Sequence, residues 1–196
     1  MCKTDFSPLS SAASGLSLNP FSRRGSPGAV LRRIRTSAGL DLTLSEAGSG
    51  DHDELYARFA EIVAAGEGYP QAPGPLAIDE FDRYWLEAKS LVAVARHGHT
   101  LVGSYYLKPN FPGRAAHIAN AGYFVVPEMR GRGAGGALVE DSLDQARALG
   151  FDALQFNLVF ASNPARRLYE RMGFEAVGRV PEAVDGEDAI IYWRRL

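Results

Sequence analysis

The chain has 196 residues, 46% of them hydrophobic and 10% aromatic, which is sufficient for one domain with a buried core plus a tail. A formal net charge of −2 predicts no global attraction to nucleic acid or to an anionic membrane. The single cysteine, Cys2, excludes a disulfide framework and a cysteine-rich metal centre, and no apolar run reaches the length of a membrane span. These features predict a cytoplasmic enzyme that works without a metal.

The first 36 residues differ in composition from the rest of the chain. They are rich in Ser, Gly and Pro, and a single acid, Asp5, stands against six basic residues: Lys3, Arg23, Arg24, Arg32, Arg33 and Arg35. The absence of an apolar core argues against a secretory signal. A disordered tail, an organelle transit peptide and a start assigned too far upstream all fit this composition. We therefore expect a tail over residues 1–36 and a folded domain over residues 37–196.

The first part of the domain alternates strand, helix and strand patterns. Leu40, Leu42 and Leu44 recur with period two, which predicts a half-buried strand. A helix is expected from Asp51 or Asp53 to about Ala65, followed by a Gly- and Pro-rich loop. A second short helix over about 79–87 and strands over 90–96 and 100–108 complete this part.

A parallel crossover is predicted in the middle of the chain. Residues 117–126 read as a strand that Pro127 stops, a glycine-rich turn opens a helix ending near Leu149, and residues 151–160 read as the next strand. Strand, helix and strand in this order place the two strands side by side. Period two puts Asn120 on the face of Ile118, Gly122 and Phe124, and Asn157 on the face opposite Leu154, Phe156, Leu158 and Phe160.

The glycine turn predicts an anion site. The N–H groups at the start of the following helix lack partners within the helix, and the helix dipole favours negative charge there. Glycines at 131, 133, 135 and 136 carry no Cβ that would hold a phosphate away, while Arg130 and Arg132 add positive charge. We expect a phosphate-bearing ligand at this turn; a turn that only packs the helix on the sheet is the alternative.

Three phosphate-binding motifs compete for the turn. Gly131, Gly133 and Gly136 match the dinucleotide spacing G-x-G-x-x-G, but the roughly 60 residues that remain are too few for a doubly wound fold. A Walker loop is excluded because no Gly-Lys-Ser/Thr follows. Arg130, Gly133 and Gly135 match R-x-x-G-x-G/A after a strand, a pattern that resembles the pyrophosphate motif of the GCN5-related N-acetyltransferases (GNAT).

Residues 162–174 add a second motif in the order that this family has. Ser162 or Asn163 is a helix cap, Pro164 suits the first turn, and Gly173 suits the C-terminal cap. The segment is similar to the GNAT pattern N-x-x-A-x-x-L-Y-x-x-x-G-F, with Tyr169 in its expected place. Ser162 stands where the family has asparagine and Asn163 follows it, so either residue is a candidate for cofactor contact.

The resemblance covers residues 39–196 and implies a fold and a co-substrate. The fold is α/β (α+β by some schemes): a single GNAT-like domain whose central mixed twisted sheet has about six to seven strands, with helices on both faces. The last strands are expected over 175–180 and 189–194, joined through Asp185-Gly186. The co-substrate is acetyl-CoA. The implied cofactor-binding residues are Phe124, Val125, Val126, Arg130, Gly131, Arg132, Gly133, Ala134, Gly135, Gly136, Ser162, Asn163 and Arg166.

The resemblance also implies acetyl transfer to an amine by direct attack in a ternary complex. The strand 123–126 is expected to pair with the pantetheine arm, and the N–H of Phe124 or Val125 to stabilise the oxyanion. Tyr169 would protonate the leaving thiolate, and Asn120 and Asn157 would orient the acceptor.

Acceptor contacts are also expected from Glu67, Tyr69 and Gln71 in the loop between the first two helices, and acidic Glu182, Asp185 and Glu187 lie in the last connection. His117 and Glu67 are the candidate bases, although parity turns His117 away from Asn120.

A weaker likeness of residues 117–125 and 155–157 to GNAT enzymes that act on small amino-acid-like amines favours a small-molecule acceptor. A protein lysine or N-terminus, an aminoglycoside, or a non-catalytic acyl-CoA sensor are the alternatives. A homodimer would be common for a domain of this size, although no stretch identifies a contact surface.

Overall fold

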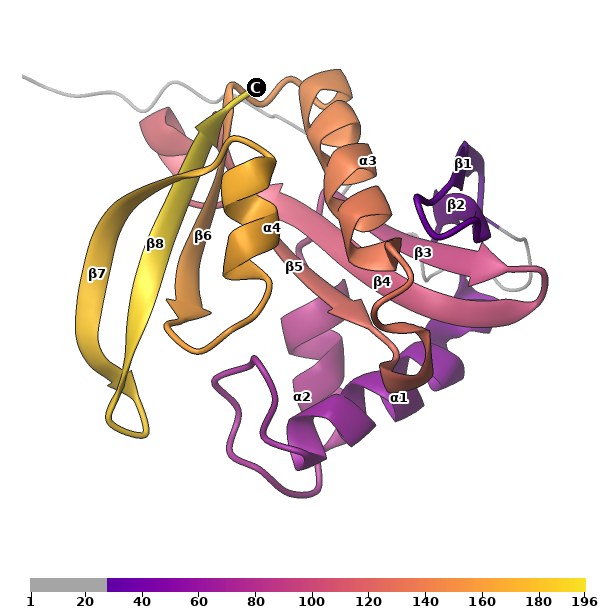
Figure 1. The fold of residues 1–196 in the computed structure, drawn as a ribbon, viewed down its shortest axis with the longest axis horizontal. Helices are drawn as coiled ribbons and strands as arrows, with labels where there is room; N and C mark the ends of the chain where they lie inside the picture. The colour runs from indigo at the N-terminus through magenta and orange to yellow at the C-terminus, as the bar shows by residue number, and fades with distance from the viewer. Residues whose placement is uncertain (1–27) are drawn as a thin grey trace, which may run out of the picture.

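The computed structural model describes residues 28–196, which form an eight-stranded sheet with helices on both faces (Figure 1). The strand order is β1-β2-β3-β4-β5-β6-β8-β7, and every neighbouring pair is antiparallel except β5 and β6. The strands are β1 (Val30–Arg35), β2 (Asp41–Glu46), β3 (Leu91–His97), β4 (Thr100–Pro109), β5 (Ile118–Val125), β6 (Ala153–Phe160), β7 (Glu175–Val184) and β8 (Glu187–Arg195). The predicted α/β class and mixed sheet are confirmed.

The eighth strand comes from a segment that composition assigned to the tail. β1 pairs with β2 from Val30 to Arg35, so the expected boundary at residue 36 lies too late in the chain. Its arginines explain the error, because charged residues suit an edge strand, whose outer side meets water, as well as they suit a tail. Residues 1–27 lie outside the described part of the chain, and so do the expectations made for them.

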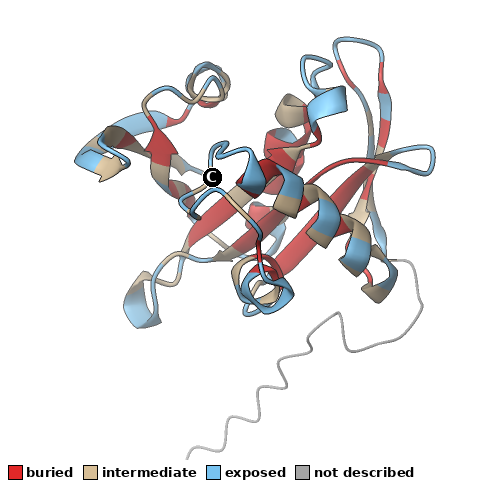
Figure 2. Cartoon of the chain, turned by 90° about the horizontal axis from the view of Figure 1, so that it is seen from below, coloured by how far each residue is buried: buried red, intermediate tan, exposed pale blue. Residues whose placement is uncertain are grey.

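The helices separate into two pairs, one on each face of the sheet. One face carries α3 (Ala134–Ala148) and the shorter α4 (Arg166–Arg171). The other face carries α1 (His52–Ala64) and α2 (Ile78–Phe81), and α2 continues into a π-helical turn over Asp82–Leu86. Each pair buries its own apolar cluster against the strands. Figure 2 shows the buried residues in red along the strands and on the inner sides of helices. None of the helices within residues 28–196 has the length and apolar character needed to cross a membrane.

Strands β5 and β6 begin side by side and then diverge. Their parallel pairing is limited to three positions, Ile118↔Ala153, Ala119↔Leu154 and Asn120↔Gln155. Beyond this point β5 pairs only with β4, and β6 pairs only with β8. The divergence opens the middle of the sheet directly after Asn120.

The strict alternation predicted for β6 is wrong in its second half. Its pairing with β8 shifts register between Phe156 and Val159, so Val159 and Phe160 are both buried while Asn157 is exposed. A β-bulge of this kind adds a residue to one strand and rotates the side chains that follow. Val159 therefore joins the core side instead of sharing the face of Asn157.

Candidate active site

A pocket of about 230 Å³ lies where β5 and β6 diverge. Because it opens at a gap in the sheet, side chains from both faces reach it: Tyr169 and Asn163 from the α4 side, and Tyr69, Tyr84 and Tyr106 from the side of α1 and α2. Strand residues complete the lining, namely Lys108, Asn120, Ala121, Gly122, Tyr123, Phe156, Asn157, Leu158 and Val159, together with Gly68 and Pro70.

The predicted glycine turn leads from β5 into α3. Gly131 and Gly133 have φ angles of +73° and +81°, a left-handed conformation that glycine adopts without strain. A Cβ on Gly133 would lie 3.0 Å from the Cβ of Thr36, in the turn between β1 and β2. A Cβ on Gly131 would meet nothing within 4 Å, so this side of the turn is open.

The turn leaves backbone donors free for a ligand. Among residues 28–196, no acceptor is found for the N–H groups of residues 131–136, and the first bond at the start of α3 runs from Ala137 N to Gly133 O at 3.2 Å. Free N–H groups at the positive end of a 15-residue helix are suited to a diphosphate. Ala134, Gly135 and Gly136 form the first turn of α3, and their role in binding a diphosphate stays a prediction.

Arg130 lies between this turn and the loop that joins α1 to α2 (residues 65–77), called the acceptor-side loop below. Its guanidinium donates to the Val125 carbonyl through Nε at 3.3 Å and to Glu67 through Nη1 at 2.5 Å. Both side chains of the ion pair are nearly half exposed, so solvent screens it. Arg132 is exposed beside Arg130. One arginine therefore fastens the loop after α1 to the glycine turn, and the other is exposed to solvent.

The register of β5 determines which backbone groups face the gap. Val126 N donates to Val102 O at 2.9 Å, and Asn110 N donates to Ile118 O at 2.8 Å. Antiparallel bonding repeats every second residue, so even-numbered residues of β5 direct their N–H and C=O groups to β4, and odd-numbered residues direct theirs toward β6. This narrows the prediction for residues 124–126: the backbone groups of Phe124 and Val126 bond to β4, and the N–H of Val125 is directed at the gap.

Tyr169 lies against the pocket with its hydroxyl free. Its ring packs 4.6 Å from that of Phe156, and it is 9% exposed. Among the described residues no hydrogen-bond partner is found for the hydroxyl, which distinguishes it from Tyr123, whose hydroxyl contacts Ser142 Oγ at 2.7 Å. Burial raises the pKa of Tyr169 above its usual value, so the phenol stays protonated and can act as a donor.

Of the two candidates at the start of α4, Asn163 lines the pocket and Ser162 is exposed. The Asn163 amide oxygen accepts from Ala165 N at 2.9 Å, in the turn that leads into α4, and among the described residues no partner is found for its amide nitrogen. Ser162 N donates to Glu187 at the start of β8. Arg166 contacts the Ala161 carbonyl and Tyr192, and it does not line the pocket.

Asn120 and Asn157 both line the pocket, but each has a protein partner. Asn120 donates to the Gln155 carbonyl at 2.9 Å across the last paired position of β5 and β6. Asn157 exchanges two amide hydrogen bonds with Asn110, at 3.1 and 2.6 Å, and also accepts from Gln155. Asn120 therefore closes the paired end of the gap, while Asn157 belongs to an exposed amide cluster at its rim.

The acceptor-side loop reaches the gap through Tyr69. The Tyr69 hydroxyl donates to the Tyr123 carbonyl, an odd-numbered group on the gap side of β5. Glu67, predicted as an acceptor contact or base, is engaged by Arg130 and does not line the pocket. His117 is also outside it, exposed and bonded to the Arg114 carbonyl through Nδ1 at 3.1 Å. The described lining contains no histidine and no carboxylate.

Sequence reasoning missed Tyr106 and Lys108, which line the pocket from β4. A Cβ on Gly122 would lie 2.6 Å from the Tyr106 ring, so the glycine lets this ring cover β5. Both residues belong to a strand that read as ordinary core. The period of two indicates their face once β4 is paired with β5. Tyr106 then lies opposite Gly122 and Lys108 opposite Asn120, two residues that the sequence had already placed on one face.

Comparison with known proteins agrees with this geometry. The sequence model of the Acetyltransferase (GNAT) family matches residues 54–174. The structure resembles that of a GCN5-related N-acetyltransferase from Kribbella flavida, with a TM-score of 0.73, 34% identity and coverage of 79% of this chain and 98% of that one.

Two further relatives extend the comparison. N-acetyltransferase aca1 of Schizosaccharomyces pombe is 44% identical over 85 residues, which are 43% of this chain and 41% of the yeast protein, so the match spans less than half of that protein. A phosphinothricin acetyltransferase from Sinorhizobium meliloti in complex with AcCoA shares the fold at 21% identity, with a TM-score of 0.70 and coverage of 79% and 88%.

Together, the family match and the shared fold identify an N-acetyltransferase of the acyltransferase class. The chain belongs to the Acetyltransferase (GNAT) family, as the R-x-x-G-x-G/A pattern at residues 130–135 and the pattern over residues 162–174 predicted. Within residues 28–196 no cluster of three or more His, Cys, Asp or Glu side chains is arranged to hold a metal ion.

Proposed function

We propose that the protein transfers the acetyl group of acetyl-CoA to the amine of a small molecule by direct attack in a ternary complex. Acetyl-CoA is the donor that GNAT enzymes use, and the Sinorhizobium meliloti relative with this fold was crystallised with it. The observation that carries the small-molecule part is the pocket of about 230 Å³ at the divergence, with Tyr169 on one side and three tyrosines on the other.

Binding of the donor rests on the backbone. The N–H groups of residues 131–136 would hold the diphosphate, and Arg132 would add charge beside it. The Val125 N–H, directed at the gap, would donate to a ligand there and stabilise an oxyanion. Asn163 would add its amide nitrogen from the start of α4. Holding both reactants in one gap makes the attack effectively intramolecular.

The reaction balances with one general acid. The acceptor nitrogen forms a bond to the thioester carbonyl carbon, the carbon–sulfur bond breaks, and Tyr169 gives its proton to the departing sulfur. Because the described pocket lining offers no carboxylate or imidazole, the amine loses its proton to water, from which the Tyr169 phenolate recovers one. Asn120, at the paired end of the gap, and Tyr69, at the Tyr123 carbonyl, would border the amine.

Thiol release from acetyl-CoA is the direct test. The purified protein would be screened with α-amino acids, polyamines and lysine-bearing peptides, with acceptor-free hydrolysis as the background. We expect a small amine to raise release above background, and the product to be identified by mass spectrometry. Acceleration by peptides alone would overturn the small-molecule assignment. Calorimetric binding of acetyl-CoA with no acceleration by any acceptor would indicate a sensor instead of an enzyme.

A further inference from the structure

Two lysines meet at one ring of the pocket. The sequence has three lysines among 21 basic residues, and the two within the described residues, Lys89 and Lys108, both lie at the ring of Tyr106. Their Nζ atoms are 4.9 and 5.9 Å from the ring centroid. Tyr106 and Lys108 are two residues apart on β4 and line the pocket from the same face. Positive charge is thus concentrated on the acceptor side.

Neither lysine is neutralised by an acidic partner. Within residues 28–196 no carboxylate forms an ion pair with either Nζ, and the Lys89 ammonium donates to the Glu87 carbonyl at 2.8 Å. Burial, and then the charge of Lys108, lower the pKa of Lys89 to about 8, while the Glu87 carboxylate offsets only part of this effect. Two like charges that are held together and only partly offset by Glu87 form a site that a bound anion would stabilise.

The charge of the pocket lining has one sign. Lys108 is the only ionic side chain among the described residues that line it. A polyamine or a lysine-rich peptide would have to bring further positive charge to this ammonium, and like charges repel at such distances. An acceptor with an acidic group gains attraction instead.

The position of Lys108 relates that acidic group to the reaction. Lys108 pairs in register with Asn120, the last residue at which β5 is bonded to β6. The cationic end of the pocket therefore lies beside the point where the strands separate. An acceptor whose amine lies at the gap would therefore have an acidic group near that amine beside Lys108.

We propose that Lys108, supported by Lys89 across the Tyr106 ring, binds the carboxylate of the acceptor, and that the acceptor is an amino acid or a close analogue. This inference rests on the proposed function, because it names the acceptor class of the same pocket. Lys108 is a specificity-determining residue, and its contact is with the part of the acceptor that does not react.

The first experiment compares α-amino acids with their carboxamides, which keep the amine and remove the negative charge. In the unaltered protein we expect kcat/KM for the acid to exceed that for the amide by about 10-fold or more, the range measured for charge-assisted hydrogen bonds. Lys108→Met should bring the ratio close to one, mainly through KM, and Lys108→Arg should restore most of it. Lys89→Met should lower the ratio less. A ratio near one in the unaltered protein would overturn the proposal.

A matched control separates local from global charge effects. Arg114→Met removes one exposed positive charge from the connection between β4 and β5, outside the pocket, and should leave the ratio unchanged. An equal loss in Arg114→Met and Lys108→Met would show that only the net charge matters, which would also overturn the proposal.

A second measurement needs no turnover. Calorimetry would compare binding of an N-acetyl amino acid with that of its amide, in the presence of CoA, to the unaltered protein and to Lys108→Met. Carboxylate-dependent binding that is lost in Lys108→Met supports the subsite even if no acceptor is acetylated, in which case the proposed function fails by itself. Equal binding of acid and amide contradicts the subsite even if acetylation of some amine is found.

Discussion

The proposed donor side and acceptor side of the site are built in different ways. On the donor side, the proposed cradle for the diphosphate is a run of six consecutive residues whose main-chain N–H groups are free. On the acceptor side, Tyr69, Tyr84, Tyr106 and Lys108 come from three separate segments and act through their side chains. A main-chain site needs only the right conformation, whereas a side-chain site needs the whole fold to bring its members together. The following variants test this contrast, beginning with the donor side.

Gly133→Val is expected to have the largest effect. The residue has a φ angle of +81°, which costs a β-branched side chain about 1–2 kcal/mol, and its Cβ would lie 3.0 Å from Thr36 Cβ. The displaced turn should weaken acetyl-CoA binding by about 1,000-fold, equivalent to about 4 kcal/mol, measured by calorimetry. Gly150→Val is the matched control, since φ is +84° there and no atom lies within 4 Å of the added Cβ. Comparable binding losses in both variants would contradict a local role for the turn.

Tyr169→Phe should separate chemistry from binding. Removing the acid is expected to lower kcat by about 100-fold at saturating acetyl-CoA, while the calorimetric affinity for acetyl-CoA stays the same. Tyr192→Phe is a suitable comparison, because its ring is 5.9 Å from that of Tyr169 and its hydroxyl contacts Glu170, outside the pocket lining. An unchanged kcat in Tyr169→Phe would remove the proposed acid.

Tyr69→Phe tests the acceptor side and should have a smaller effect. The change removes the bond to the Tyr123 carbonyl, worth about 1 kcal/mol before the donor binds, and it also removes a hydroxyl that lines the pocket, so we expect the KM for the acceptor to rise about fivefold. Tyr56→Phe removes a similar bond, from a hydroxyl to the Leu76 carbonyl at 2.8 Å, outside the pocket. The two variants should lose similar stability in thermal unfolding, and only Tyr69→Phe should change steady-state kinetics.

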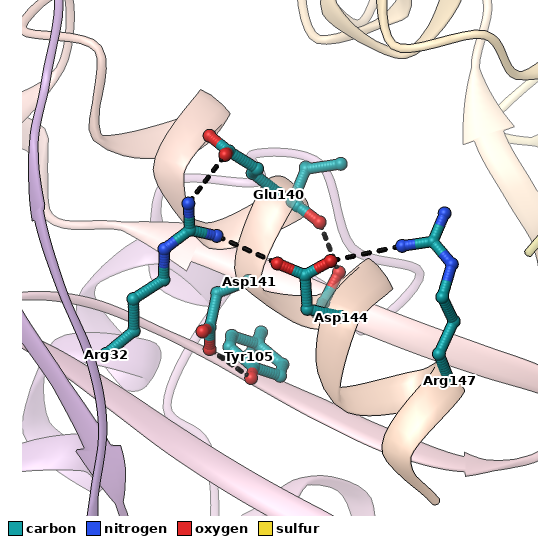
Figure 3. Close-up of polar contacts among 8 residues, drawn as sticks. Arg32, Tyr105, Glu140, Asp141, Asp144 and Arg147 are labelled. Atoms are coloured by element: carbon teal, nitrogen blue, oxygen red, sulfur yellow. Dashed lines mark hydrogen bonds and ion pairs between the residues drawn. The ribbon is translucent and has the colours of Figure 1, made fainter. Parts of the chain in front are cut away.

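The smallest expected effect is a pH-dependent change in stability at α3, the helix that follows the glycine turn (Figure 3). Asp141 is fully buried, and its Oδ2 accepts from the Tyr105 hydroxyl at 2.6 Å, while Arg32 lies near it and pairs with Glu140 and Asp144. Burial raises the pKa of Asp141 above 3.8, although Tyr105 and Arg32 lower it and Asp144 raises it further. As the pH falls, the Asp141 carboxyl therefore takes up its proton at a higher pH in the folded state than in the unfolded state. The stability that this proton uptake contributes is fully present below pH 3.8 and is lost as the pH rises through the pKa of the folded state.

Asp141→Asn removes this titration. The melting temperature of the unaltered protein, measured relative to the variant, should rise by a few degrees when the pH is lowered from 7 toward 3.8. Circular dichroism at both pH values measures the difference. A difference that stays constant with pH would contradict the assignment to Asp141.

The same contrast explains how much could be predicted from sequence. The glycine turn, Tyr169 and the parallel crossover were readable because each is a local pattern with a fixed physical meaning. The order of the strands and the membership of the acceptor pocket were not, because Lys108 and Tyr106 are recognisable as pocket residues only after β4 is paired with β5. β1 was missed because arginines on an edge strand resemble those of a tail, and the face of Val159 because a bulge breaks the period of two.

The carbonyl groups of Tyr123 and Val125 already have partners within the chain, the Tyr69 hydroxyl and the Arg130 guanidinium. An incoming amide that bonds to either carbonyl exchanges one partner for another, so the net enthalpy from these contacts is small. The exchange also frees the loop after α1, because Tyr69 and the Glu67–Arg130 pair fasten it to β5. Donor binding and loosening of the acceptor-side loop are thereby coupled, which favours an ordered sequence in which acetyl-CoA binds first.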